Sequence, residues 1–88
     1  MDTQNLKAFV AVAEHLSFSA AAEQLHITQP AISKRIHLLE QQLASSLFDR
    51  VGRQVSLTEA GRTLLPLAQN ILDAISMAKQ AVADLSGE

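Results

Sequence analysis

The chain has 88 residues, of which 48% are hydrophobic and 18% charged, a length and composition that suit one compact domain around a single small core. The absence of cysteine excludes disulfides, thiolate metal sites and cysteine nucleophiles. Because the three histidines are also scattered, we expect no metal and no cofactor. The formal net charge of −2 argues against a protein that coats nucleic acid, and because no basic leader or long apolar run occurs, we expect a cytoplasmic chain without membrane contact.

The first predicted element is an amphipathic helix near the N-terminus. Asp2 or Thr3 can cap this helix, because either side chain can accept a hydrogen bond from a backbone N–H group of the first turn. Its apolar side chains recur at helical spacing, at Leu6, Phe9, Val10, Ala13 and Leu16. The helix is therefore expected to pack this stripe against the elements that follow.

A short second helix and a longer third helix are expected next, on either side of a tight turn. A serine among residues 17–19 can cap the second helix, in which the small Ala21 and Ala22 allow a neighbouring helix to pack closely. Thr28 can cap the third helix, and Pro30 is tolerated in its first turn because a backbone N–H there has no helical partner. Two helices therefore meet across a turn.

The third helix has two chemically different faces. One face is apolar and carries Ile32, Ile36, Leu39 and Leu43. The opposite face is polar and partly basic, and it carries Pro30, Ser33, Lys34, His37 and Gln41. A helix held through its apolar face can present short polar side chains near its N-terminus to base edges in a DNA major groove.

A small β-hairpin is predicted after the third helix. It is formed by residues 47–51 and 55–57 on either side of residues 52–54, with a glycine and an arginine at the tip. Residues 28–53, which include the third helix and the tip, have a net charge of +2, whereas the flanking segments each have −2. The positive charge is therefore local, which suits contact with phosphates by one face of the molecule.

The last predicted element is a long helix that Thr58 can cap. Its apolar residues alternate between spacings of four and three residues, the period of a coiled-coil seam, and the residues expected to mediate dimerisation are Leu64, Ala68, Ile71, Ile75, Ala78, Val82 and Leu85. Leu65 and Leu72 fall outside this seam and can serve the core of the domain. Pro66 removes a helical hydrogen bond, so we expect either a kink or a late helix start there.

These elements, in this order, would build a winged helix-turn-helix. The chain resembles the LysR-type transcriptional regulators over about residues 6–72. The residues that carry this resemblance are Phe9, Phe18, Ser19, Ala21, Ala22, Leu25, Gln29, Pro30, Ala31, Ser33, Ile36, Leu39, Glu40, Leu47, Phe48, Arg50, Leu57, Thr58 and Gly61.

The resemblance implies a mainly α fold in which a winged helix-turn-helix, with a three-helix core and a small β-hairpin wing, is followed by a long linker helix. We assign residues 1–58 to the DNA-binding domain, about 18–37 to the helix-turn-helix proper and 59–88 to the linker helix. The resemblance further implies an effector-binding domain that is absent from this chain, and a small-molecule co-inducer for that domain. It also implies a homodimer with antiparallel linker helices, which becomes a tetramer in the full-length protein.

The chain departs from the family pattern at two positions. Ala44 stands where the family usually has a glycine that ends the recognition helix in a left-handed conformation. Either this helix ends differently, or alanine is strained there by about 1 kcal/mol. Leu38 is apolar where the family often has a polar residue, and we assign it no function.

The expected DNA contacts fall into two groups. The major-groove group consists of Thr28, Gln29, Pro30, Ser33, Lys34 and His37. The group expected at phosphates or in the minor groove consists of Ser19, Arg35, Arg50 and Arg53. Alternatives remain open: Lys34 and His37 could be solvated surface residues, and Arg50 could pair with Glu40 or Asp49 instead of a phosphate.

The predicted function is sequence-specific binding of double-stranded DNA as the reading head of a bacterial LysR-type regulator. A dimer would bind an interrupted palindrome, with the third helix in the major groove and the wing at the adjacent minor groove. A helical protein-interaction module is the alternative, and it would explain the 3.5-residue repeat but not the wing. An enzyme is disfavoured, because the chain has no nucleophile with a base, glycine-rich phosphate loop or ligand cluster.

Overall fold

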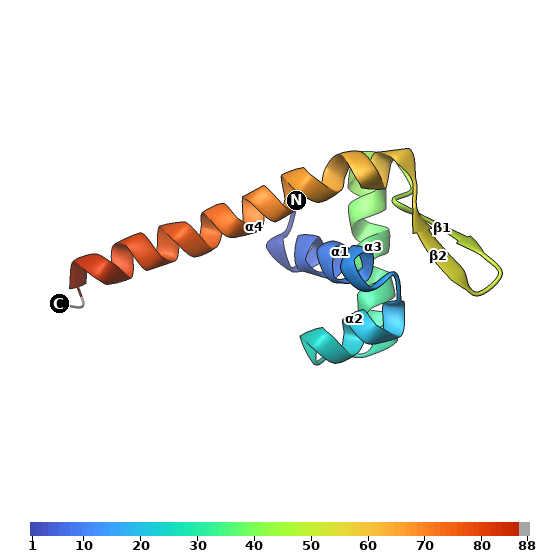
Figure 1. The fold of residues 1–88 in the computed structure, drawn as a ribbon, viewed down its shortest axis with the longest axis horizontal. Helices are drawn as coiled ribbons and strands as arrows, with labels where there is room; N and C mark the ends of the chain where they lie inside the picture. The colour runs from blue at the N-terminus through green and yellow to red at the C-terminus, as the bar shows by residue number, and fades with distance from the viewer. Residues whose placement is uncertain (87–88) are drawn as a thin grey trace.

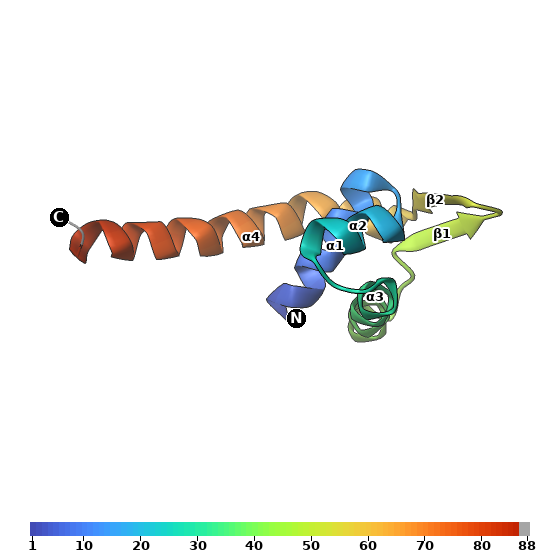
Figure 2. The same ribbon diagram turned by 90° about the horizontal axis from the view of Figure 1, so that it is seen from below.

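The computed structural model describes residues 1–86. It contains four helices and one two-stranded antiparallel hairpin, namely α1 (Thr3–His15), α2 (Phe18–Leu25), α3 (Gln29–Leu43), β1 (Phe48–Val51), β2 (Gln54–Leu57) and α4 (Glu59–Ser86) (Figure 1). This architecture confirms the expected fold class. The molecule is elongated, 53 × 25 × 18 Å, and the hairpin and the C-terminal end of α4 lie at opposite ends of it (Figures 1 and 2).

Side-chain caps fix the starts of the first three helices, as predicted. The backbone N–H of Gln4 donates to the Asp2 carboxylate at 2.7 Å, which identifies Asp2 as the cap of α1. Ser17 caps α2 by accepting from the N–H of Ala20, and Thr28 caps α3 in the same way. Each cap satisfies a backbone donor that has no partner within its own helix.

The same three helices end in a left-handed residue that is not glycine. Leu16, His26 and Ala44 end α1, α2 and α3 with φ of 50°, 58° and 53°. Ala44 therefore ends α3 in the left-handed conformation, which is the strained one of the two alternatives expected for it. The conformation lets the N–H of Ser45 donate to the carbonyl of Glu40 at 3.1 Å, so the chain turns sharply out of α3 towards the hairpin.

The hydrophobic core forms where α1 packs against α2, α3 and the first turns of α4. Its largest fully buried side chains come from α1, α3 and the residue before β1, and they are Leu6, Phe9, Val12, Ile32, Leu39 and Leu47. The apolar stripes predicted for the first and third helices therefore face each other, except at their C-terminal ends, where Leu16 and Leu43 are exposed. The core fixes α3 from one side and leaves its other side at the edge of the molecule (Figure 2).

The hairpin has a two-residue turn, one residue shorter than expected. Phe48 pairs with Leu57 and Val51 pairs with Gln54, which leaves Gly52 and Arg53 at the tip. Gly52 has φ of 63°, a conformation that two-residue hairpin turns require and glycine adopts readily. Arg53 therefore lies at the tip of the wing, as predicted.

A compact junction joins the hairpin to α4. The Thr58 hydroxyl donates to the carbonyl of Ser46 at 2.6 Å and accepts from the N–H of Gly61, while the Thr58 N–H donates to the carbonyl of Leu47. Gly61 is buried, and any Cβ there would collide with the carbonyl oxygen of Leu47. Glycine is required because α4 approaches the backbone before β1 so closely.

The long helix α4 begins at Glu59 and continues through Pro66, so the expectation of a late helix start is wrong. Its first half packs on the core through Leu65 and Leu72, as predicted, and also through Leu64 and Ala68. Ala68 has no exposed surface within its own chain and cannot contact a partner, which corrects its assignment to the dimerisation seam. In residues 1–86, no helix is both long and apolar enough to cross a membrane.

Candidate nucleic-acid interface

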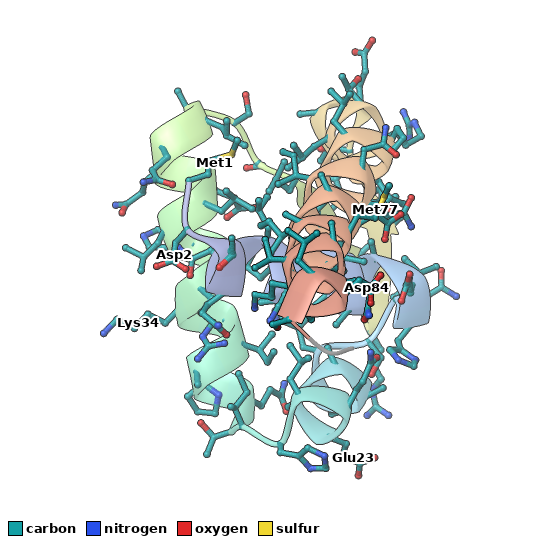
Figure 3. The ribbon with its side chains drawn as sticks, turned by 90° about the vertical axis from the view of Figure 1, so that its left-hand side faces the viewer. Met1, Asp2, Glu23, Lys34, Met77 and Asp84 are labelled. Carbon is teal, nitrogen blue, oxygen red and sulfur yellow. The ribbon has the colours of Figure 1, made fainter. Side chains whose placement is uncertain are left out.

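The outer face of α3 carries polar side chains, most of them exposed. Gln29, Pro30, Lys34 and His37 are exposed and Ser33 is half-buried, whereas the opposite face of the helix is buried in the core. Figure 3 shows Lys34 projecting from α3 away from the body of the molecule. Thr28, the cap of α3, is exposed beside them. The six residues expected in the major groove are thus available to a ligand on one side of one rigid helix.

A polar groove runs between the hairpin and the beginnings of α2 and α3. Its lining residues are Leu16, Ser17, Phe18, Ser19, Gln29, Arg50, Gly52, Arg53, Gln54 and Val55. Four of these had been predicted as DNA contacts from separate stretches of the sequence: Ser19, Gln29, Arg50 and Arg53. The fold therefore brings the hairpin and the starts of α2 and α3 to one continuous surface.

A second groove lies on the other side of Arg50, between α3 and β1. Its lining residues are Phe18, Ser33, Ile36, His37, Glu40, Ser46, Phe48 and Arg50. It includes Ser33 and His37 from the predicted major-groove group. Phe18 and Arg50 line both grooves, so they mark the border between the surface of α3 and the surface of the wing.

The positive end of the helix dipole adds to the positive charge of the first groove. Ser17, the cap of α2, and Gln29, the first residue of α3, both line it beside two arginines. The N-terminus of a helix carries a partial positive charge and backbone N–H groups suited to an anion. The groove therefore combines the features that favour phosphate oxygens, although the whole chain carries a formal charge of −2.

Arg35 is a predicted contact that lines neither groove. It is half-buried, and its Nη1 donates to the side-chain oxygen of Gln4 at 3.3 Å, which connects α3 to the start of α1. The other predicted residues that line neither groove, Thr28, Pro30 and Lys34, remain on the exposed side of α3. The hydrogen bond of Arg35 thus reaches another helix, whereas the hydroxyls of Ser19 and Thr28 bond locally, to Ser17 and to the N–H of Ala31.

Arg50 does not make the ion pair that the sequence left open. The Glu40 carboxylate accepts the backbone N–H of Leu47 at 2.8 Å instead, and in residues 1–86 Arg50 pairs with neither Glu40 nor Asp49. The Arg50 guanidinium lies over the ring of Phe18, 3.9 Å from its centre. This stacking joins β1 to α2, and sequence reasoning missed it because it connects residues far apart along the chain.

Sequence reasoning also missed two polar groove residues, Ser17 and Gln54. Ser17 had been considered only as a cap, and Gln54 only as a turn residue. The alternation of strand side chains could have assigned Gln54 to a face of the wing, but only with the correct turn length. In the described part of the chain, no group of three histidine or acidic residues could hold a metal ion.

A helix-turn-helix with a hairpin wing defines the class of this protein. Residues 3–62 match the family model described as bacterial regulatory helix-turn-helix protein, lysR family. Because this match covers more than half of the chain, the chain belongs to the LysR family of bacterial regulatory helix-turn-helix proteins.

Curated relatives agree with this assignment. The chain is 58% identical, over its whole length, to a protein of Azotobacter vinelandii described as an uncharacterized HTH-type transcriptional regulator in the ibpB-leuC intergenic region. It is 43% identical over 82 residues to the RuBisCO operon transcriptional regulator of Acidithiobacillus ferrooxidans. The chain spans 61% of the first relative and 26% of the second.

Solved structures show the same fold in proteins bound to DNA. The CbnR DNA-binding domain in its complex with DNA matches with a TM-score of 0.91 and 35% identity, covering 98% of this chain and 99% of that one. The BenM DNA-binding domain on the benA site 1 DNA matches with a TM-score of 0.87 and 35% identity over the full length of both chains. Full-length CbnR in its complex with the target DNA matches with a TM-score of 0.85 and 38% identity, covering 94% of this chain and 29% of that one.

Proposed function

We propose that the outer face of α3 reads base edges in a DNA major groove while the wing and the start of α2 hold the DNA backbone. The observation that carries this proposal is the pair of grooves that meet at Arg50 and collect predicted contacts from α2, α3 and the hairpin. Gln29, Pro30, Ser33 and Lys34 are the proposed base-reading residues. Ser19, Arg50 and Arg53 are the proposed contacts to phosphate or the minor groove.

The test compares one contact of each kind on the preferred DNA sequence and on mixed-sequence DNA. A good base contact contributes roughly 1–3 kcal/mol of discrimination, so Ser33→Ala should weaken binding more on the preferred site than on mixed DNA. Arg53→Ala should weaken binding on both and reduce the salt slope by about one. Lys79→Ala removes the same charge from the exposed distal part of α4 and should change neither quantity.

Three outcomes would contradict this assignment. An equal loss on both DNAs for Ser33→Ala would move Ser33 to the backbone contacts. An unchanged salt slope for Arg53→Ala would remove the wing from the interface. A wild-type chain without salt-dependent binding to any duplex would favour the helical protein-interaction module instead.

We further propose that the chain dimerises through the part of α4 from Ile71 onwards and reads two half-sites of an interrupted palindrome. Ile71, Val82 and Leu85 are large apolar side chains of the predicted seam that are exposed in the single chain, and Val82 and Leu85 are 66% and 86% exposed. A stripe of this kind on a 3.5-residue period is typical of helices that pair. Ala68 has no part in this contact because it is fully buried in its own chain, whereas Leu64 is only half-buried.

The oligomeric state can be tested by sedimentation of the chain and two variants. Ile75→Asp places a charge in the seam and should yield monomers that bind one half-site weakly, because the second half-site contact is no longer at high effective concentration. Met77→Asp places the same charge outside the seam on an exposed residue and should remain dimeric. A monomeric wild-type chain at high micromolar concentration, or full palindrome binding by Ile75→Asp, contradicts the dimer.

For the longer protein of which this chain would be part, we propose a regulator whose effector-binding domain follows α4. The basis is that the chain covers only 26% and 30% of two matched proteins, the Acidithiobacillus regulator and the LysR family transcriptional regulator VV2_1132. That domain would bind a small-molecule co-inducer, and the whole protein would form a tetramer on chromosomal DNA in the bacterial cytoplasm. Isothermal titration of candidate metabolites against the isolated chain should give no heat, because the domain proposed to bind them lies outside this chain.

A further inference from the structure

Three phenylalanines form a continuous stack that leads from the core to the border of the two grooves. The Phe9 and Phe48 rings lie 5.5 Å apart with planes tilted by 47°, and the Phe48 and Phe18 rings meet edge to face at 5.8 Å. The Arg50 guanidinium covers the outer side of Phe18 at 3.9 Å. The stack therefore joins α1, β1, α2 and again β1 in that order.

The ring of Phe18 is fixed in place before any ligand arrives. Its side chain is only 7% exposed, and Phe48 holds its inner side while Phe9, which is fully buried, holds Phe48. Phe18 is also the first residue of α2, directly after the capping Ser17, so its backbone is fixed by the helix start. A cation stacked on such a ring loses much of the motion of a free arginine side chain.

The stacking occupies the face of the Arg50 guanidinium and leaves its edge to a ligand. The five N–H donors of a guanidinium point outward in its own plane, so a ring against its face does not block them. In residues 1–86, the structure gives Arg50 no hydrogen bond to another protein atom. The exposed edge stands where the groove of α3 meets the groove of the wing.

We propose that Phe18 is a positioning residue, which holds the Arg50 guanidinium at the border of the two grooves with its N–H edge ready for one DNA phosphate. This inference rests on the proposed DNA contact of Arg50 and adds how that contact is made. Although Phe18 lines both grooves, only 7% of it is exposed, because its inner side faces Phe48 and Arg50 covers its outer side. Preorganisation strengthens binding because less motion is lost when the phosphate binds.

The test is a double-mutant cycle on a mixed-sequence duplex, with affinity measured over a range of salt concentrations. Arg50→Ala should reduce the salt slope by about one, the value for one phosphate contact. Phe18→Leu should weaken binding about three- to tenfold in the wild-type background, the range expected for one stacked cation. In the Arg50→Ala background, Phe18→Leu should have no further effect, because no guanidinium remains to be held.

A matched control separates positioning from a general loss of stability. Val12→Ala shortens a fully buried α1 side chain that is not part of the aromatic stack, and its effect on binding should add to that of Arg50→Ala. Phe18→Tyr keeps the aromatic face and should restore the binding that Phe18→Leu loses. Circular dichroism fixes a temperature at which every variant compared is folded.

A second substitution tests the inference even if Phe18→Leu does not fold. Arg50→Lys keeps the charge but loses the planar group that stacks, so it should retain the salt slope while binding about three- to tenfold more weakly. Wild-type affinity for Arg50→Lys overturns the positioning role. Additive effects of Phe18→Leu and Arg50→Ala overturn it as well, while the Arg50 contact stands. No effect of Arg50→Ala on affinity or slope means that the proposed contact itself is wrong.

Discussion

The two halves of α4 share one spacing of apolar residues but have different surroundings. In residues 59–72, Gly61 and Ala68 are buried, and Leu64, Leu65 and Leu72 are half-buried against the core, as shown by their contacts. In residues 73–86, every side chain is exposed except the half-buried Ile75. Figure 1 shows the corresponding difference in shape, with the first half lying along the domain and the second extending away from it.

This difference shows what an apolar repeat can and cannot predict. The spacing of four and three residues runs through both halves without interruption, and a stripe of this kind needs a partner. In the proximal half the partner is the chain's own α1, whereas the distal half has none within the described residues. The repeat therefore predicts two apolar stripes, and only the fold shows which of them the chain itself covers.

The largest expected effect comes from one charge placed in the proximal stripe. Ala68→Asp would bury a carboxylate without a partner, which should lower the free energy of unfolding by about 3–5 kcal/mol. Because a domain of this size has little stability to lose, the variant should be largely unfolded at 25 °C. Urea denaturation followed by circular dichroism measures the loss.

Ala78→Asp is the matched control in the distal stripe. The substitution is the same and the helix is the same, but Ala78 is exposed, so the unfolding free energy of the single chain should change by less than about 0.5 kcal/mol. Its effect should appear in the sedimentation of the proposed dimer. Similar destabilisation of the monomer by both variants would break the distinction between the two halves.

Gly61→Ala tests the close approach of the proximal half. The new Cβ would collide with the carbonyl oxygen of Leu47 and lie 2.8 Å from a methyl carbon of Leu57, so α4 must shift away from the hairpin. We expect a loss of about 1–3 kcal/mol in thermal or urea unfolding, the range for overpacking. In an ordinary helix, replacing glycine with alanine is stabilising. An unchanged or higher free energy of unfolding for Gly61→Ala would therefore mean that α4 and the hairpin can move apart at little cost.

The smallest expected effect is a gain. Ala44→Gly removes the strain of a left-handed alanine at the end of α3 and should raise the free energy of unfolding by about 0.5–1 kcal/mol, partly offset by the greater freedom of glycine in the unfolded chain. The dissociation constant of the proposed dimer should not change, because the end of α3 lies outside α4. A parallel change in both quantities would indicate that the core and the distal half are coupled.

The helix starts were predictable from the sequence because the signals are local. Asp2, Ser17 and Thr28 each bond to an N–H two or three residues away, so a short stretch of chain contains the whole interaction. The hairpin was placed to within one residue for the same reason, from Gly52. Ala68 was assigned wrongly because heptad spacing carries no information on which partner covers it.

The sequence was enough to name many residues of the candidate site, but not the contacts between them. The phase of α3 was enough to place Ser33 and Lys34 on its outer side. The stacking of Arg50 on Phe18 depends on how β1 crosses the start of α2, and no local pattern encodes that crossing. The same tertiary arrangement gave Glu40 a backbone partner and removed it as a partner for Arg50.

The unbroken course of α4 has a consequence for the DNA that a dimer can recognise. A helix of 28 residues spans about 42 Å at a rise of about 1.5 Å per residue. In the proposed dimer, α4 therefore sets the distance between the paired apolar stripes and the DNA-binding domains. One residue inserted after Leu72 would lengthen α4 by about 1.5 Å and rotate each DNA-binding domain by about 100° around the helix axis. The number of residues in α4 thus determines which half-site spacing such a dimer can bind.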